Sequence, residues 1–381
     1  MSDFNIYHII NPYKPLTTEL DECKKQLSND LEIFKEYTKS FVLSNSVGYI
    51  YLLYEIPCIF PNITTLVLNG SAFTMEALSY LLDSLKYLED LNLTENLIFK
   101  DEEISNEYTI NYPISLRSLK LGDNGVMMIK DKFNSVRKMK IIHEGSETYE
   151  FTGTHQHLPN LITFDYDLHY DSSEENDDLL EFIILNLQLK NLILFGPNFS
   201  LKLFDIIKTL KSLIYLDFKC DYYEELIYEY EMPILYNIKH LNIEAIHYSR
   251  LIIENNFPNV EELVIEFDWH RCNEVYDLIQ RFPKLKSLKL ISLNIFENAI
   301  KITLLKLNSL EKLEINFNYR EGKFEDIELD VSACDKLKSI SITKNECHSP
   351  FQKLDHTQTF KAGWDYYYFP HKLFFVKIFN K

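Results

Sequence analysis

A short apolar phrase recurs along this chain at nearly even intervals and predicts an α/β solenoid, with parallel strands on a concave side and helices on a convex side. The phrase consists of an apolar residue, two mostly polar residues, a second apolar residue, one variable residue and a third apolar residue. Residues 88–93 are an example. The phrase occurs twelve times in steps of 20 to 28 residues, centred on Leu66, Leu91, Leu119, Met139, Phe164, Leu192, Leu216, Leu241, Leu263, Leu288, Leu313 and Ile340.

Each phrase predicts a short strand with one buried face, because apolar residues two positions apart on a strand point to the same side. One unit of about 25 residues cannot enclose a core alone, so neighbouring units must stack. A weaker phrase centred on Phe41 adds one more strand at the start. We therefore interpret the chain as a leucine-rich repeat solenoid, a horseshoe of about 12–13 repeats of about 25 residues each.

The segments that return the chain between strands are expected to be helical more often than extended. Apolar residues follow three-to-four spacing at 72–84, 201–210 and 273–282, which is typical of amphipathic helices. Several returns end in a proline just before the next strand, and proline stops a helix. These prolines are Pro61, Pro159, Pro258 and Pro283.

Three parts of the chain follow from this pattern. Residues 1–35 are expected to form an N-terminal helical cap, residues 36–348 the leucine-rich repeat domain, and residues 349–381 an aromatic C-terminal cap. The aromatic and mildly basic residues 364–379 also suit a membrane-surface anchor. We favour the cap, because the last strand of a solenoid needs a cover.

Composition places the chain inside the cell. Of its 381 residues 46% are hydrophobic, yet no apolar run approaches the roughly 20 residues that span a bilayer, and no secretory leader opens the chain. The six cysteines form no CxxC pair, which favours free thiols in a reducing compartment. We expect a cytoplasmic or nuclear protein that does not associate with membranes.

The net charge of −18 argues against nucleic acid as a partner, since phosphate binding needs clustered Lys and Arg. Much of the acid lies in two stretches, residues 170–178 and 221–231. We interpret both as solvated segments on the convex side.

The residues that alternate with the buried apolar ones should line the concave face. There, Lys120, Lys138 and Lys140 predict a small basic patch, followed by a mainly acidic stripe. Such a stripe suits a protein partner with a basic segment, and the alternative is an ordinary solvated surface. The candidate partner-binding residues are Asp165, Asp167, Tyr215, Asp217, His240, Glu244, Glu262 and Glu266.

Enzyme chemistry is not expected, and we assign no catalytic, cofactor-binding or metal-binding residue. His155 and His157 resemble half of a metal site, but no acidic or cysteine partner stands at a recognisable spacing. With nine glycines in the whole chain, no glycine-rich phosphate loop is present.

The Phe-Pro phrases that begin at residues 60, 257 and 282 resemble those of ribonuclease-inhibitor-like and F-box-associated leucine-rich repeat proteins, as found in large fungal sets. Asn96, Asn124, Asn318 and Asn345 match the asparagine that follows the phrase in such repeats. The resemblance implies a substrate receptor of a cullin-based ubiquitin ligase. Residues 1–34 lack the Leu-Pro-x-Glu-Ile-like opening of an F-box, so the chain is either a receptor that has lost this domain or a stand-alone scaffold.

Overall fold

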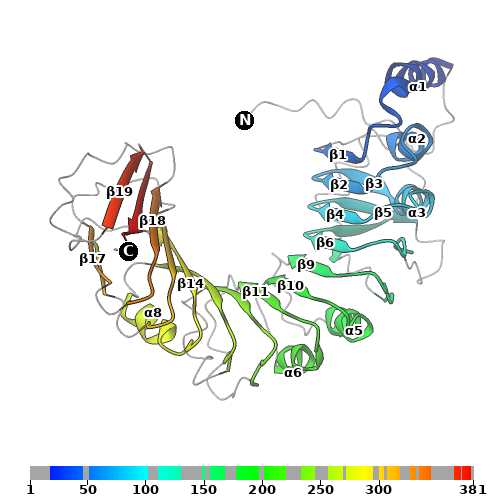
Figure 1. The fold of residues 1–381 in the computed structure, drawn as a ribbon. Helices are drawn as coiled ribbons and strands as arrows, with labels where there is room; N and C mark the ends of the chain where they lie inside the picture. Colours follow the sequence, from blue (N-terminus) through cyan, green and yellow to red (C-terminus); the bar gives the residue numbers. More distant parts are fainter. Residues whose placement is uncertain are drawn as a thin grey trace. The chain divides into compact units, whose positions relative to one another are not determined.

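The computed structural model shows two compact units, Met1–Asn198 and Phe199–Lys381 (Figure 1). Each unit contains a parallel sheet. The residues that the structure describes are 18–45, 51–101, 110–129, 148–150, 155–167, 177–196, 201–219, 233–244, 256–268, 272–294, 300–303, 307–317, 327–331, 334–344, 364–369 and 371–378.

The first unit contains a parallel sheet in which every strand comes from one apolar phrase. Phe41 pairs with Leu66, Leu66 with Leu91, and Leu91 with Leu119, so the central apolar residues form one row. The weak first phrase is therefore a strand, as predicted. In spatial order the strands are β1 (Ser40–Ser44), β2 (Thr65–Asn69), β4 (Asp90–Thr94), β6 (Ser118–Gly122), β9 (Thr163–Asp167) and β10 (Asn191–Phe195).

The second unit repeats this arrangement. Leu216 pairs with Leu241, Leu241 with Leu263, and the same register continues to Ile340. The parallel strands are β11 (Tyr215–Lys219), β12 (His240–Glu244), β13 (Glu262–Asp268), β14 (Ser287–Asn294), β16 (Lys312–Phe317) and β18 (Ser339–Lys344).

A repeated set of backbone hydrogen bonds joins each strand to the next at its N-terminal end. The carbonyl oxygen of Glu261, for example, accepts hydrogen bonds from the N–H groups of both Lys286 and Ser287, at 2.8 and 3.0 Å. The same pair of hydrogen bonds recurs along both sheets, at the carbonyls of Lys39, Thr64, Glu89, Arg117, Ile162, Ile214, Lys239, Lys286 and Glu311. Because the register is the same at every step, the apolar residues form a continuous buried column. The chain has the α/β leucine-rich repeat fold.

One predicted strand is absent from the sheet. The phrase centred on Met139 lies outside the described residues, and we predicted that it would form a strand between those of Leu119 and Phe164. Instead, β6 pairs directly with β9, with Leu119 opposite Phe164. The prediction was wrong, because an alternating apolar pattern in a single segment does not specify which strand it will meet.

Helices cover the side of each sheet that the apolar residues face (Figure 1). The predicted helices at 72–84, 201–210 and 273–282 correspond to α3 (Met75–Ser84), α6 (Leu201–Thr209) and α8 (Cys272–Ile279). The hydroxyl of Thr74 accepts a hydrogen bond from the N–H of Ala77 at 3.2 Å and so caps α3. The remaining helices are α1 (Thr18–Leu31), the 3-10 helix η2 (Glu32–Phe34), α2 (Tyr51–Ile59) and α5 (Asp177–Leu185). Among the described residues, no helix is long and apolar enough to cross a bilayer.

Part of the convex side is extended rather than helical, which the sequence did not predict. Four short strands of the first unit form a second sheet in the order β3 (Ala72–Thr74), β5 (Leu97–Asp101), β7 (Gly125–Ile129) and β8 (Thr148–Glu150). Ala72, Phe99 and Met127 form one buried cluster on it. In the second unit, β15 (Ile300–Thr303) pairs in parallel with β17 (Ile327–Asp330). A short apolar run fits a strand as well as a helix, and the neighbouring repeat decides between them.

Buried asparagines bind the turns that follow the strands of the first unit. Asn96 accepts a hydrogen bond from the N–H of Ser71 at 3.1 Å and donates to the carbonyl of Leu68 at 2.8 Å and to Oδ1 of Asn124 at 2.9 Å. Asn124 repeats the pattern by donating to the carbonyl of Leu93. Each side chain therefore joins its own repeat to the preceding one.

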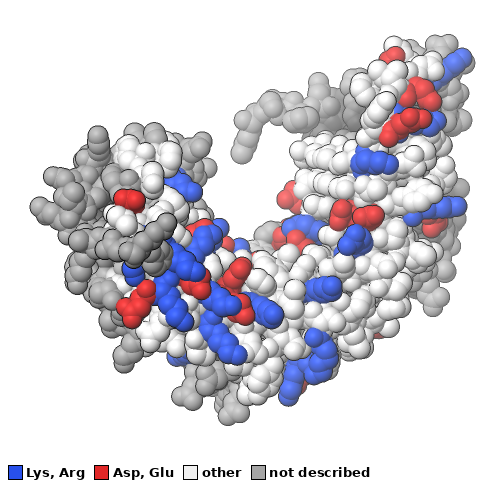
Figure 2. Space-filling model, in the orientation of Figure 1, with Lys and Arg blue, Asp and Glu red and all other residues white. Residues whose placement is uncertain are grey.

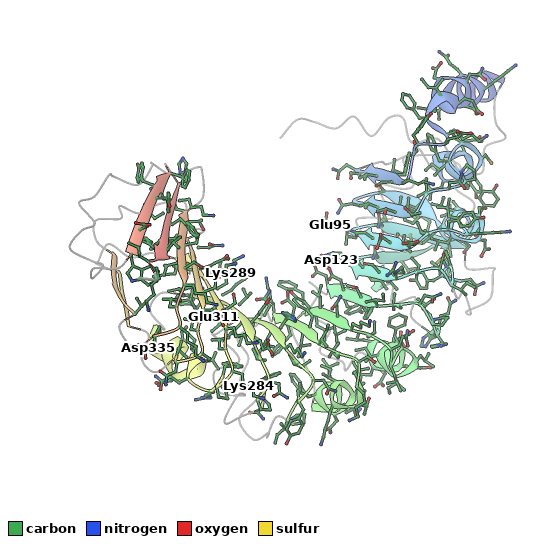
Figure 3. All side chains as sticks on the ribbon, viewed as in Figure 1. Glu95, Asp123, Lys284, Lys289, Glu311 and Asp335 are labelled. Carbon is green, nitrogen blue, oxygen red and sulfur yellow. The ribbon has the colours of Figure 1, made fainter. Side chains whose placement is uncertain are left out.

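The residue just before this position adopts positive φ in four consecutive repeats. These residues are Asn45, Gly70, Glu95 and Asp123, with φ between 50° and 57°. Asn, Gly and Asp tolerate this left-handed conformation, whereas it is less common for Glu. Glu95 directly follows β4 and Asp123 directly follows β6, so the two residues occupy equivalent positions in successive repeats (Figure 3).

The C-terminal residues form a hairpin of β19 (Trp364–Phe369) and β20 (Lys372–Lys377). Strand β20 pairs antiparallel with β18, with Phe375 opposite Ile340 and Leu373 opposite Ile342. Phe375 and Leu373 are both buried. The hairpin thus covers the edge of the last parallel strand with aromatic and aliphatic side chains.

Replacing Asn96 with Ala should destabilise the protein by about 2–3 kcal/mol, because Ala leaves the N–H of Ser71 and the carbonyl of Leu68 buried without these partners. The unfolding midpoint in urea measures this loss. Asn160→Ala is the control, since Asn160 is exposed and donates one bond, to the carbonyl of Ile114. Equal midpoints for the two variants would contradict a structural role for the asparagine ladder.

Candidate functional site

The side of each sheet opposite the helices presents the residues that alternate with the buried apolar ones. In β2, β9 and β10 these residues are partly exposed while the two apolar residues between them are buried. Because the register never shifts within these strands, equivalent residues of successive repeats form rows across the sheet. We call this surface the sheet face.

Five of the predicted partner-binding residues meet on three adjacent strands of the second unit. Tyr215 of β11 lies opposite His240 of β12, which lies opposite Glu262 of β13. Asp217 and Glu266 lie two and four residues further along β11 and β13. The structure therefore places these five residues close together on three adjacent strands, and we call this group the polar network.

Asp217 occupies the floor of this network. Its carboxylate accepts hydrogen bonds from Nδ2 of Asn242 at 2.8 Å and from the hydroxyl of Tyr215 at 3.3 Å. Burial raises the pKa of Asp217, while the bond from Asn242 and the nearby ammonium of Lys219 act in the opposite direction. We predicted an exposed member of an acidic stripe, but only 9% of Asp217 is exposed, because the neighbouring strand brings Asn242 against it and Lys219 lies two residues along its own strand.

The other carboxylates of the network have partners on other strands of the sheet. Lys219 Nζ lies 2.7 Å from Glu266 Oε1, and His240 Nδ1 lies 2.9 Å from Glu262 Oε2. Further along the sheet, Lys312 forms an ion pair with Glu314. The predicted acidic stripe is therefore locally balanced by cations in the described part of this sheet. His240 supplies a charge only when its imidazole is protonated.

The remaining predicted residues do not join this network. Asp165 and Asp167 lie on β9 in the first unit, where Lys120 Nζ is 3.0 Å from Asp165 Oδ2. A Cβ atom on Gly122 would lie 2.8 Å from Cβ of Asp167, so the glycine allows these strands to approach here. Glu244 ends β12 and its side chain is not described, and the predicted basic residues Lys138 and Lys140 also lie outside the described residues.

Asn242 was not predicted, although it occupies the variable position between the last two apolar residues of its phrase. Its amide carries no charge, so the charge pattern of the sequence does not reveal it. A second set of surface residues was also not predicted. It occupies the first of the two polar positions of each phrase, where Lys and Glu alternate from Lys239 to Lys338.

The two histidines considered as metal ligands have other contacts. His155 Nε2 lies 3.4 Å from Asp178 and Nδ1 lies 3.3 Å from Glu181, both on α5, and His157 Nδ1 lies 2.7 Å from the carbonyl of Leu185. No group of three or more His, Cys, Asp or Glu side chains in the described ranges is arranged to hold a metal ion. Cys58 and Cys334, whose side chains are described, are both free thiols.

No protein-family model matches the chain, and no curated protein matches it in sequence. The solved structures that it resembles include the leucine-rich repeat ectodomain of the Arabidopsis receptor kinase HAESA, in complex with an N-terminally extended IDA peptide hormone ligand. The two chains are 14% identical with a TM-score of 0.27, and the match covers 72% of this chain and 44% of that one. This chain thus spans less than half the length of that ectodomain, and the fold assignment above rests on the strand register.

Replacing Asp217 with Asn should change how stability depends on pH. Because burial raises the pKa of Asp217 in the folded protein, the folded state retains this proton over a pH range in which the unfolded chain has released it. The free energy of unfolding then decreases as pH rises from the unfolded pKa through the raised folded pKa. Asp217→Asn removes this decrease and keeps an acceptor for Asn242, so the variant should gain stability relative to the natural protein as pH rises.

Thermal unfolding midpoints measured from about pH 3.9, the ordinary pKa of Asp, upward to neutral pH test this expectation. Asp205→Asn, an exposed position on α6, is the control and should track the natural protein. A difference between Asp217→Asn and the natural protein that stays constant with pH would contradict it.

Proposed function

We propose that the chain is a non-catalytic protein-interaction scaffold that binds a protein partner on the sheet face, centred on β11, β12 and β13. The observation that supports this most directly is the network of Tyr215, Asp217, His240 and Glu262. It presents an aromatic ring and several hydrogen-bonding groups from three strands in one register. Aromatic residues within a polar surround often dominate the energy of protein interfaces.

The chemistry of the network favours a partner with a basic segment. Glu266 is paired with Lys219, but Asp217 is held mainly by neutral donors. Among the described residues, Glu262 is paired with His240, which is cationic only when protonated. The side chain of Glu262 is 59% exposed and so accessible to a partner. Oδ1 of Asp217 and Oδ1 of Asn242 are buried and accept no hydrogen bond from the described residues. A Lys or Arg of the partner would add charge complementarity at the exposed carboxylate of Glu262.

The returns between strands support the ribonuclease-inhibitor-like subclass, since α3, α5, α6 and α8 each connect consecutive phrases. We place the protein in the cytoplasm or nucleus, where Cys58 and Cys334 would remain reduced. Service as a ubiquitin-ligase substrate receptor rests on the sequence resemblance alone. It is tested by whether a cullin and its adaptor are recovered with the protein.

Replacing Glu262 with Lys should abolish partner binding, because it reverses the charge of the exposed carboxylate at the centre of the patch. Tyr215→Ala should weaken binding by about tenfold or more, as expected for loss of an aromatic anchor worth about 2 kcal/mol. Tagged protein is recovered from its native cells, and the co-purifying proteins are quantified by mass spectrometry.

Asp205→Lys is the matched control, since it makes the same charge reversal at an exposed position of α6 in the same unit. The partner should be recovered with the natural protein and with Asp205→Lys, and lost with Glu262→Lys. Equal recovery with all three proteins would refute binding at this patch.

A further inference from the structure

A row of alternating Lys and Glu side chains crosses the second unit at the N-terminal ends of its strands. Each residue of the row immediately precedes the first residue of a strand. The row runs in the order Lys239, Glu261, Lys286, Glu311 and Lys338, and we call it the lysine row. The carbonyl of each of the first four accepts the two N–H bonds from the next repeat, so the backbone fixes their order and spacing.

Two ion pairs link the row across strands. Lys286 Nζ lies 2.7 Å from Glu261 Oε2, and Lys338 Nζ lies 2.5 Å from Glu311 Oε2. The hydrogen bond from Lys286 lowers the pKa of Glu261, and that from Lys338 lowers the pKa of Glu311. Each of these carboxylates is therefore ion-paired with the lysine of the next repeat.

Cations remain in excess along this edge. Lys239 and Lys336 form no ion pair within 4 Å with a described residue, although the charge of Lys239 helps to lower the pKa of Glu261 and that of Lys336 the pKa of Glu311. Lys284 Nζ donates to the amide oxygen of Asn259 at 2.6 Å. Asp335 is the additional carboxylate nearby. Lys and Arg gather over this part of the unit (Figure 2), and Lys284, Glu311 and Asp335 lie on neighbouring repeats along it (Figure 3). The excess is unexpected in a chain with a net charge of −18.

Apolar side chains lie at the β11 end of the same edge. Ile214 occupies the position of the row in its own repeat, and its carbonyl accepts the N–H groups of Lys239 and His240. Ile214 is 39% exposed, and Tyr236, in the turn before Lys239, is 61% exposed. The edge thus combines an apolar end with a line of ammonium groups.

We propose that the lysine row, together with the adjacent Lys284 and Lys336, binds an extended acidic segment of a protein partner, with carboxylates at every third residue and an apolar residue at the β11 end. Successive lysines of the row are two strands apart, which is about 10 Å at a strand spacing of about 4.8 Å. Three residues of extended chain span the same distance at about 3.3 Å each. The periodicity of the partner follows from this match.

The alternation with glutamate disfavours a nucleic acid at this edge. Glu261 and Glu311 stand between the lysines, where they would repel a backbone that carries a phosphate at each nucleotide. A peptide can place neutral residues opposite the glutamates and acidic residues opposite the lysines.

This proposal does not rest on the sheet-face function, because the row uses none of the residues assigned to that patch. The probe is a short fluorescent peptide with a leading Leu, a Glu at every third position and Ser between. A second peptide of the same composition has its Glu residues contiguous. Binding to the full chain is followed by fluorescence anisotropy at low and physiological salt.

The test variant carries Lys239→Gln, Lys284→Gln and Lys336→Gln, which keeps both ion pairs of the row. The control carries Lys86→Gln, Lys190→Gln and Lys208→Gln, which makes the same change in net charge at exposed positions elsewhere. Circular dichroism establishes that both variants fold. We expect the spaced peptide to bind the natural protein and the control equally within twofold, and the test variant at least tenfold more weakly.

Several results would overturn the proposal: no binding of the spaced peptide, equal binding of the contiguous peptide, or the same loss of binding in both variants. Tighter binding of a single-stranded oligonucleotide than of the spaced peptide would assign the edge to nucleic acid instead. The peptide comparison on the natural protein decides the question even if the test variant fails to fold. Loss of this interaction leaves the Glu262→Lys experiment unaffected, so the two proposals fail separately.

Discussion

In-register parallel pairing between successive repeats is the constraint on which the rest of the structure depends. Each repeat supplies one strand whose apolar residues are buried only because the next repeat lies beside it in the same register, as Leu241 does beside Leu263. A slip of one residue would turn the apolar side to solvent and bury the polar one. The carbonyl that accepts two N–H groups from the next repeat opposes such a slip, since it secures each strand at its first residue.

Because of this pairing, residues at the same position in successive repeats lie beside one another in the sheet. Residues that are about 25 positions apart in the sequence become neighbours about 4.8 Å apart, so a chemical preference at one position of the phrase becomes a row. At the central positions of β11 to β13 the row is a polar network around Asp217, and just before the strands it is the lysine row. Acidic side chains on both surfaces find cations on neighbouring strands, so net charge is a poor guide to either surface.

The repeats could be predicted from the sequence because their apolar period is strong and recurs at a constant spacing. The helices were predicted where amphipathic spacing extends over several turns, as in α3, whereas β5 and β7 were not. The five-residue strands 97–101 and 125–129 are too short for periodicity to distinguish a strand from a helix. The phrase around Met139 shows the opposite failure, since it fits the pattern and yet β6 pairs with β9.

The sequence by itself determined the fold class and the rows of residues that face away from the core, because both follow from the alternation within a strand and from the repeat length. Only the tertiary structure decided what those residues do. Asp217 is buried because Asn242 and Lys219 pack around it. The negative charge of Glu266 is offset by an ion pair with Lys219, which lies two strands away. Burial and pairing are properties of neighbours brought together by folding, and a single phrase does not specify its neighbours.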